Sequence, residues 1–276
     1  MKRSVAGLAA ATAHSLVLSV IPAGAAPLKN IVLVHGAWVD ASGWKPVYDI
    51  LVREGFDVTL VQEPETSHAD DVAAARRSLD IQDGPTLLVG HSYGGSVITE
   101  AGAHPNVAGL VYVAAHAPDV GEDEAGLGAK YPSTLARTAG AIKVTPDGFT
   151  YLYPPAFLKL FAVGLPDEQA TFQARSQVMA NKEIFRSPMT VAAWRDKPTW
   201  GIVAGDDRII SPDLERFYYE RAQADWSVVP GASHSVYQTH WVEVAGVIAA
   251  AARWFGEDPQ AKTKADQIRQ QQARNE

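Results

Sequence analysis

The residues Gly90-His91-Ser92-Tyr93-Gly94-Gly95 place a serine among glycines, between an apolar stretch at 86–89 and a helix-like stretch that begins at Tyr93. A G-x-S-x-G sequence between a strand and a helix is typical of a tight turn that leaves the serine hydroxyl exposed above a sheet. The small residues on either side let the strand and the helix pack closely. Ser92 is therefore the candidate nucleophile. A phosphate-binding loop is excluded, because no Gly-Lys-Ser/Thr sequence follows.

A serine hydroxyl becomes a good nucleophile only beside a general base. Two further strand-like stretches, 200–204 and 225–229, end near polar residues that can serve this purpose. The first is followed by Asp206 and Asp207, and the second by His234. Because the carboxyl ends of parallel strands share one edge of a sheet, we expect these residues to meet the serine there. His234 is the candidate general base, and either aspartate is a candidate for the acid that orients it.

Acyl transfer also needs preorganised hydrogen-bond donors for the oxyanion. One predicted donor is the backbone N–H of Tyr93, the residue after the serine. The second is expected from the loop His35-Gly36-Ala37-Trp38, with the Ala37 N–H as the first candidate and the Trp38 N–H as the alternative. No metal site is expected, because the chain has no cysteine and no H-E-x-x-H sequence.

These groups can meet only if the strands that carry them end at one edge. Short apolar stretches that suit buried strands alternate along the chain with amphipathic, helix-like stretches. This alternation predicts an α/β fold, with a mostly parallel sheet of about six strands and helices on both faces. The expected strands are 31–34, 56–61, 86–89, 107–113, 200–204 and 225–229, and the expected helices are 44–54, 70–79, 93–103, 212–222 and 241–255.

Residues 118–196 interrupt this alternation and form a segment too long for a bare loop. They include helix-like stretches at 155–163 and 166–179 and several aromatic residues. We expect an inserted helical cap over the edge that carries the serine, and packing helices without substrate contact are the alternative. The residues expected to bind substrate are Trp38, His116, Tyr151, Phe157 and Phe161.

The composition is that of an ordinary globular protein. The chain has 276 residues, of which 47% are hydrophobic and 20% charged, and its formal net charge is -7. This mildly acidic balance argues against nucleic-acid binding, which needs a basic patch or stripe. The absence of cysteine excludes a thiolate nucleophile and a disulfide framework.

Residues 1–26 are predicted to be a signal peptide. Lys2 and Arg3 precede a stretch of mostly small, apolar residues, and Ala23-Gly24-Ala25 offers a cleavage site. The stretch is too short and too rich in small residues for a stable membrane span. We expect a periplasmic or secreted protein, or a cytoplasmic one if the N-terminus is not a signal. Residues 27–117 and 197–256 are expected to form the core, and 257–276 a polar tail.

The stretches I-V-L-V-H-G-A-W, L-L-V-G-H-S-Y-G-G and G-A-S-H resemble the small α/β-hydrolases, which include bacterial carboxylesterases, plant methyl-ester hydrolases and the related hydroxynitrile lyases. The resemblance covers residues 29–255. It implies the α/β-hydrolase fold, a Ser-Asp-His triad and no cofactor. It also favours Asp207 as the acid, by similarity to the G-x-x-D-x-I-x-P pattern of this fold. The pattern is one residue tighter here, so Asp206 remains the alternative.

Together these features predict a serine esterase that cleaves small or medium apolar carboxylic esters, with lactones as a close variant. Hydroxynitrile lyase and cofactor-free perhydrolase activities are alternatives on the same frame. A lyase is disfavoured because Ser235 follows His234, where the plant lyases carry a lysine. A non-enzymatic ligand receptor is the last alternative, and the intact triad argues against it. The expected partner is a small-molecule ester.

Overall fold

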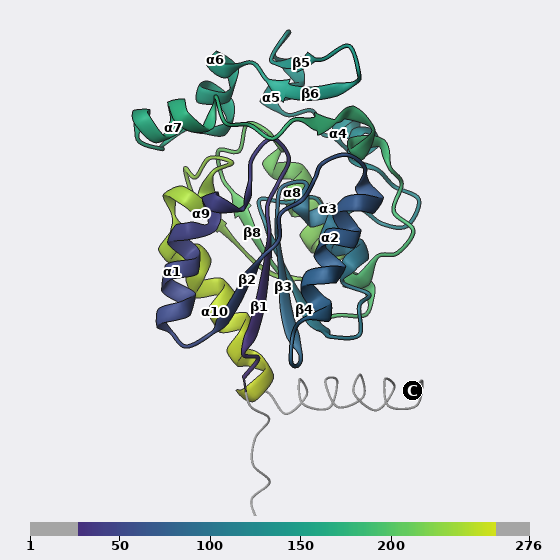
Figure 1. The fold of residues 1–276 in the computed structure, drawn as a ribbon, viewed down its shortest axis with the longest axis vertical. Coiled ribbons are helices and arrows are strands. Elements are labelled where there is room, and N and C mark those ends of the chain that lie inside the picture. Colours follow the sequence, from purple (N-terminus) through teal and green to yellow (C-terminus); the bar gives the residue numbers. More distant parts are fainter. Residues whose placement is uncertain (1–26, 258–276) are drawn as a thin grey trace, which may run out of the picture.

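The structure is a computed structural model that describes residues 27–257 (Figure 1). The predicted signal peptide, residues 1–26, lies outside the described residues. The predicted polar tail, 257–276, also lies outside them, apart from Glu257 at the end of the last helix. Among the described residues, no helix combines the length and the apolar character that crossing a membrane requires.

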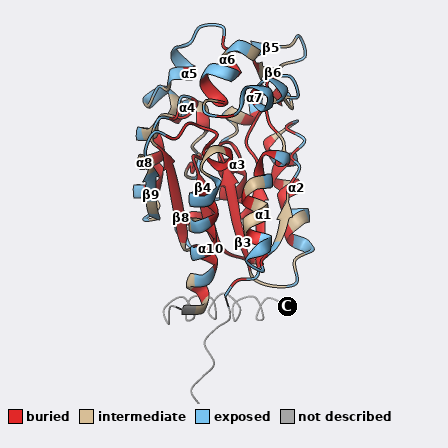
Figure 2. Cartoon of the chain, turned by 90° about the vertical axis from the view of Figure 1, so that its left-hand side faces the viewer, coloured by how far each residue is buried: buried red, intermediate tan, exposed pale blue. Residues whose placement is uncertain are grey.

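The central sheet has six strands, all parallel, in the order β2-β1-β3-β4-β8-β9. The strands are β1 (Asn30–Val34), β2 (Asp57–Leu60), β3 (Thr86–His91), β4 (Val107–Val113), β8 (Thr199–Ala204) and β9 (Asp225–Val229). The four inner strands are buried along their whole length, because helices cover both faces, whereas the edge strands are partly exposed (Figure 2). The predicted six-stranded parallel sheet is confirmed.

Helices form a layer on each face of this sheet (Figure 1). They are α1 (Lys45–Arg53), α2 (His68–Asp80), α3 (Gly94–Ala101), α8 (Pro212–Arg221) and α10 (Trp241–Glu257). Because side chains alternate along a strand, Ile31 and Leu33 pack with α1 and α10 on one face. Val32 and Val34 pack with α2, α3 and α8 on the other face. The hydrophobic core is therefore two apolar layers, one on each side of the sheet.

Helix α2 begins two residues before the predicted position. Its N-cap is Ser67, whose Oγ accepts a 3.1 Å hydrogen bond from the Asp70 N–H. Asp70 and Asp71 lie in the first turn, where the helix dipole favours negative charge. Asp71 is also fully buried, and this position brings its carboxylate close to the site described below.

The cap connects β4 to β8 and lies above the carboxyl ends of the strands (Figure 1). Its helices are α4 (Glu124–Lys130), α5 (Thr134–Arg137), α6 (Pro154–Ala156), a π-helix (Phe157–Phe161) and α7 (Asp167–Gln173). The cap also holds an antiparallel sheet that was not expected in a helical cap. This sheet consists of β5 (Ile142–Val144), β6 (Phe149–Leu152) and β7 (Ala180–Asn181). The helix expected at 166–179 ends at Gln173.

Candidate active site

Ser92 lies in the turn between β3 and α3, at the carboxyl edge of the sheet. Its φ of 55° falls in the left-handed region, which is uncommon for a residue with a side chain. Close packing fixes this backbone. A Cβ added at Gly94 would lie 2.2 Å from the His35 carbonyl oxygen, and one added at Gly36 would lie 2.6 Å from Cβ of Ser92. Only glycine fits at these two positions, so the turn holds the serine in a strained, defined orientation.

Three side chains from distant parts of the chain form a continuous hydrogen-bonded line. Nε2 of His234 lies 2.9 Å from Oγ of Ser92, and Nδ1 of His234 lies 2.6 Å from Oδ2 of Asp207. All three residues are buried. With its proton on Nδ1, the imidazole donates to the carboxylate and leaves Nε2 free to accept the serine proton.

The structure brings Asp207, and not Asp206, to the histidine. Oδ1 of Asp207 accepts hydrogen bonds from the N–H groups of Ile209 and Ile210, at 2.7 and 3.0 Å, which leaves Oδ2 for His234. Asp206 has an exposed side chain, and its backbone N–H donates to a carbonyl in the loop before the histidine. The alternative acid therefore ties two loops together through its backbone.

A second buried acid, Glu215, lies next to Asp207. Glu215 of α8 accepts a 3.0 Å hydrogen bond from the Ala204 N–H. Burial, followed by the negative charge of Asp207, raises the pKa of Glu215 well above its usual value. Burial and the nearby carboxylate thus both favour the protonated, neutral form of Glu215.

The imidazole of His234 is held from two further sides. Nε2 of His91 bonds the backbone carbonyl of His234 at 2.9 Å, and burial keeps the pKa of His91 well below its usual value. Phe161 meets the His234 ring edge to face, with ring centroids 4.8 Å apart, and Phe157 stacks on Phe161. These two phenylalanines were expected to contact substrate. The structure instead places them in the core, where they pack behind His234.

The predicted oxyanion donors lie on both sides of Ser92. The Tyr93 N–H is at the start of α3, where backbone N–H groups have no partner within the helix. In the loop after β1, the Trp38 N–H donates to Oε2 of Glu65 at 3.1 Å. That bond occupies the alternative donor, which leaves the Ala37 N–H as the candidate in this loop.

A buried carboxylate joins the two oxyanion segments. Asp71 accepts the Tyr93 hydroxyl on Oδ2 at 2.7 Å and the Glu65 N–H on Oδ1 at 2.8 Å. Glu65 in turn holds the Trp38 N–H. Burial raises the pKa of Asp71 to about 6 and that of Glu65 well above its usual value. Neither acid was predicted from the sequence to have a role here.

A cavity of about 300 Å³ opens beside Ser92. Two of the predicted substrate-binding residues, Trp38 and His116, line it. Its other lining residues are Ala37, Tyr93, Glu124, Ala125, Gly128, Leu135, Ile142, Thr150, Lys182, Phe185, Arg186 and Ile209. The cavity is thus mostly apolar, with a few polar side chains that can orient a substrate.

Tyr151 was expected in this cavity, but its neighbour Thr150 lines it instead. Side chains of β6 alternate between two faces, and Thr150 and Leu152 are the buried pair. Oγ1 of Thr150 also accepts a 3.1 Å hydrogen bond from the indole N–H of Trp38. Tyr151 lies between these two residues, so its side chain is on the opposite face of β6.

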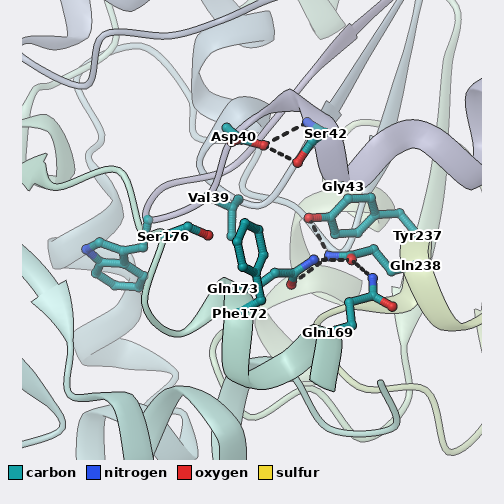
Figure 3. A pocket seen from close by; sticks show the side chains of 11 residues that line it. Val39, Asp40, Ser42, Gly43, Gln169, Phe172, Gln173, Ser176, Tyr237 and Gln238 are labelled. Carbon is teal, nitrogen blue, oxygen red and sulfur yellow. Dashed lines mark hydrogen bonds between the residues drawn. The ribbon is translucent and has the colours of Figure 1, made fainter. Parts of the chain in front are cut away.

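A second cavity, of about 220 Å³, lies between the cap and the core (Figure 3). Gln169 and Gln173 of α7 donate to Oε1 of Gln238 at 3.0 and 2.7 Å, and Gln238 donates to the Tyr237 hydroxyl at 2.9 Å. Gln238 belongs to α9 (Val236–Thr239), directly after the loop of the catalytic histidine. Trp38 lines both cavities and so forms the wall between them.

Comparison with known families identifies the family of this chain. A model of the Alpha/beta hydrolase family matches residues 31–247. The chain belongs to the alpha/beta hydrolase family. In the α/β-hydrolase fold a strand-turn-helix carries the nucleophile, and the acid and the histidine follow in the chain, which is the order of Ser92, Asp207 and His234 here. A search of curated protein sequences finds no match.

Several solved structures share the alpha/beta hydrolase fold of this chain. A pyrethroid hydrolase from Sphingobium faniae JZ-2 has a TM-score of 0.68 and 21% identity, over 84% of this chain and 98% of the other. Polyneuridine aldehyde esterase has a TM-score of 0.67 and 16% identity, over 81% and 98%. A methylesterase from Arabidopsis has a TM-score of 0.65 and 18% identity, over 80% and 98%. At these identities the likeness shows the fold.

Proposed function

We propose that this alpha/beta hydrolase is a serine esterase that cleaves carboxylic esters through an acyl-enzyme. The observation that carries the proposal is the continuous line from Ser92 Oγ to His234 and on to Asp207, at 2.9 and 2.6 Å. A hydroxyl, an imidazole and a buried carboxylate in this order are what nucleophilic acyl transfer requires. A protein that only binds ligands has no need of an aligned base.

In the proposed reaction, Ser92 Oγ attacks the ester carbonyl carbon while Nε2 of His234 takes the hydroxyl proton. The Tyr93 and Ala37 N–H groups stabilise the oxyanion of the tetrahedral intermediate. The same histidine returns the proton to the leaving alcohol, which gives the acyl-enzyme. His234 then activates water, and hydrolysis of the acyl-enzyme releases the acid and restores the serine.

The cavity supports a small or medium, mostly apolar ester as the substrate. A volume of about 300 Å³ is at the lower end of the range for small-molecule sites. Two structural neighbours are named as esterases and a third as a pyrethroid hydrolase, and such acyl chemistry fits the triad of this chain. Lactones fit the same mechanism, because a lactone is a cyclic ester.

The residue after the histidine favours hydrolysis over cyanohydrin cleavage. Ser235 is fully buried, and its hydroxyl donates to the Phe161 carbonyl at 2.7 Å. This position therefore offers no cation for a cyanide leaving group. Perhydrolysis uses the same acyl-enzyme with peroxide in place of water, and it is a side reaction of the proposed mechanism.

The test is the loss of esterase activity in Ser92→Ala, with p-nitrophenyl acetate as the substrate. We expect kcat to fall by at least about 1,000-fold while the fold is retained, because the nucleophile is removed. Ser227→Ala, at an exposed serine of β9, is the matched control and keeps full activity. Undiminished turnover by Ser92→Ala, or a fluorophosphonate adduct mapped to another serine, would reject the assignment.

A further inference from the structure

The cavity beside Ser92 contains a second pair of polar side chains that the triad does not use, Glu124 and His116. Glu124 lies in the first turn of α4 and is only 7% exposed. Its Oε1 accepts a 2.5 Å hydrogen bond from the hydroxyl of Ser96 in α3. That bond anchors one oxygen of the carboxyl group in the core and leaves Oε2 for another partner.

His116 stands next to the nucleophile in the loop after β4. Its backbone N–H donates to the carbonyl oxygen of Ser92 at 3.1 Å. Its Nδ1 lies 3.2 Å from the hydroxyl of Tyr218 in α8. Its Nε2 lies 3.4 Å from Oε2 of Glu124, which is longer than a good hydrogen bond. Hydrogen bonds to Ser96 and Tyr218 thus hold the Glu124 and His116 side chains in place. The two atoms that face each other, Oε2 of Glu124 and Nε2 of His116, form no good hydrogen bond.

Both groups are neutral near pH 7. Burial raises the pKa of Glu124 to about 8 and lowers that of His116 to about 3. A protonated carboxyl at Oε2 is a donor, and a neutral imidazole with its proton on Nδ1 is an acceptor at Nε2. The pair therefore presents one donor and one acceptor inside a mostly apolar cavity.

We propose that Glu124 and His116 form a recognition site for a hydroxyl group of the substrate, so that the natural ester carries a hydroxyl on the part that lies in this cavity. This inference rests on the proposed esterase function. A hydroxyl oxygen can accept from Oε2 of Glu124 while its proton is donated to Nε2 of His116. A carbonyl or an ether can only accept, and an ammonium group meets Lys182 and Arg186, which line the same cavity.

Such a site should discriminate strongly, because a substrate without the hydroxyl leaves two polar atoms without a partner in a mostly apolar cavity. The test compares p-nitrophenyl 3-phenylpropanoate with analogues that carry one hydroxyl on carbon 2, on carbon 3, or at the meta or para position of the ring. Methoxy analogues, which only accept, accompany each hydroxyl. The same groups are then placed on the alcohol half, in phenylpropyl acetates.

We expect one hydroxylated ester to exceed both its parent and its methoxy analogue by at least about 100-fold in kcat/KM. In Glu124→Leu and in His116→Phe, this ratio should fall to about one, whatever the absolute rates. Glu168→Gln, at an exposed glutamate of α7, is the control and should leave the ratio unchanged. Thermal unfolding shows which variants are folded. If Glu124→Leu is not folded, the test uses His116→Phe alone.

The outcomes separate this proposal from the proposed esterase function. If the protein hydrolyses the parent esters but favours no hydroxylated analogue by more than about threefold, the hydroxyl site is wrong and the esterase stands. A preference that survives in a folded His116→Phe variant also overturns the site. If no ester is hydrolysed and Ser92 is not labelled by a fluorophosphonate, the esterase proposal itself fails.

Discussion

The backbone N–H of Trp38 donates a 3.1 Å hydrogen bond to Oε2 of Glu65, a buried acid 27 residues further along the chain. The N–H of Glu65 is held by Asp71, and Asp71 also accepts the hydroxyl of Tyr93, the residue after the nucleophile. One buried carboxylate therefore sets the distance between the two segments that supply the oxyanion donors. The positions of the proposed oxyanion donors therefore depend on Glu65 and Asp71, neither of which lines the cavity beside Ser92.

Tyr93→Phe removes one arm of this network while keeping the ring. We expect kcat for p-nitrophenyl acetate to fall about tenfold with little change in KM, because a small displacement of an oxyanion donor weakens transition-state binding. Tyr151→Phe, which removes a hydroxyl from the cap strand β6, is the control. A folded Tyr93→Phe variant with unchanged kcat contradicts the role given to the network.

The adjacent aspartates should differ strongly in rate. Asp207→Asn loses the carboxylate that orients His234 and stabilises its cation, so we expect kcat to fall by about 10,000-fold. Asp206→Asn changes an exposed side chain and keeps the backbone hydrogen bond, so we expect a change of less than about threefold. Steady-state kinetics of the two variants test which aspartate is the acid. A larger loss of kcat in Asp206→Asn than in Asp207→Asn would assign that role to Asp206.

Two glycine-to-alanine substitutions should act in opposite directions on stability. At Gly94 the added Cβ would lie 2.2 Å from the His35 carbonyl oxygen, so we expect a clear drop in Tm and loss of esterase activity. At Gly246, in α10, no atom lies near the added Cβ, so Gly246→Ala should stabilise the helix by up to about 1 kcal/mol. Denaturant unfolding measures both, and equal tolerance at the two positions argues against a tightly packed elbow.

The buried carboxyls predict that stability falls as the pH rises from 6.5 to 8. In the folded protein burial raises the pKa of Glu124 from 4.5 to about 8, so the folded chain keeps a proton that the unfolded chain has lost. The free energy of unfolding then falls by up to about 1.4 kcal/mol per pH unit for such a group. Burial likewise raises the pKa values of Glu63, Glu65 and Glu215 well above normal.

Buried histidines such as His116, whose pKa is lowered, oppose this trend until the pH is about one unit above their ordinary value of 6.5. Chemical denaturation at pH 6.5, 7.25 and 8 therefore tests the carboxyls most directly in the upper half of this range. Glu124→Gln, which cannot ionise, should show a shallower decline than the unmodified protein. A free energy of unfolding that rises between pH 6.5 and pH 8 would refute the prediction.

The glutamines of the second cavity, Gln169, Gln173 and Gln238, are predicted to attach helix α7 of the cap to the core. Gln238→Leu removes the acceptor of both α7 amides, so we expect hydrogen exchange in α7 to become faster than in the unmodified protein. Gln82→Leu, which disturbs only bonds to Thr59 and Ser78 in the core, is the comparison. Unaltered exchange of α7 in Gln238→Leu means that the cluster does not hold the cap.

Local patterns were enough to predict the central sheet and to propose the three triad positions. Continuous apolar stretches identified the inner strands, and glycines around Ser92 identified the turn. Asp207 could be preferred but not separated from its neighbour, because the choice depends on which carboxylate the loop turns inward. The two N–H groups that hold Oδ1 of Asp207 make that choice, and they are visible only in three dimensions.

The cap was predicted less well, for two different reasons. Its small sheet carried a usable signal, since Pro146-Asp147-Gly148 is a typical turn sequence between β5 and β6. The exposed, three-residue β5 offered no alternation to support it. The buried acids had no local signal, because Glu124 owes its environment to Ser96, 28 residues earlier. Ordinary acidic residues in a sequence are expected on the surface.

The cap leaves the sheet after β4 and returns at β8, and these two strands are direct neighbours, with Val113 opposite Ile202. Because the two strands are parallel, the chain leaves at the carboxyl end of β4 and must cross back to the amino end of β8, where Thr199 pairs with Leu110. Ser92, Asp207 and His234 all lie outside it, whereas Glu124 lies within it. A chimaera that exchanges this insertion between family members should therefore keep its own triad and change only the part of the substrate cavity that the insertion lines.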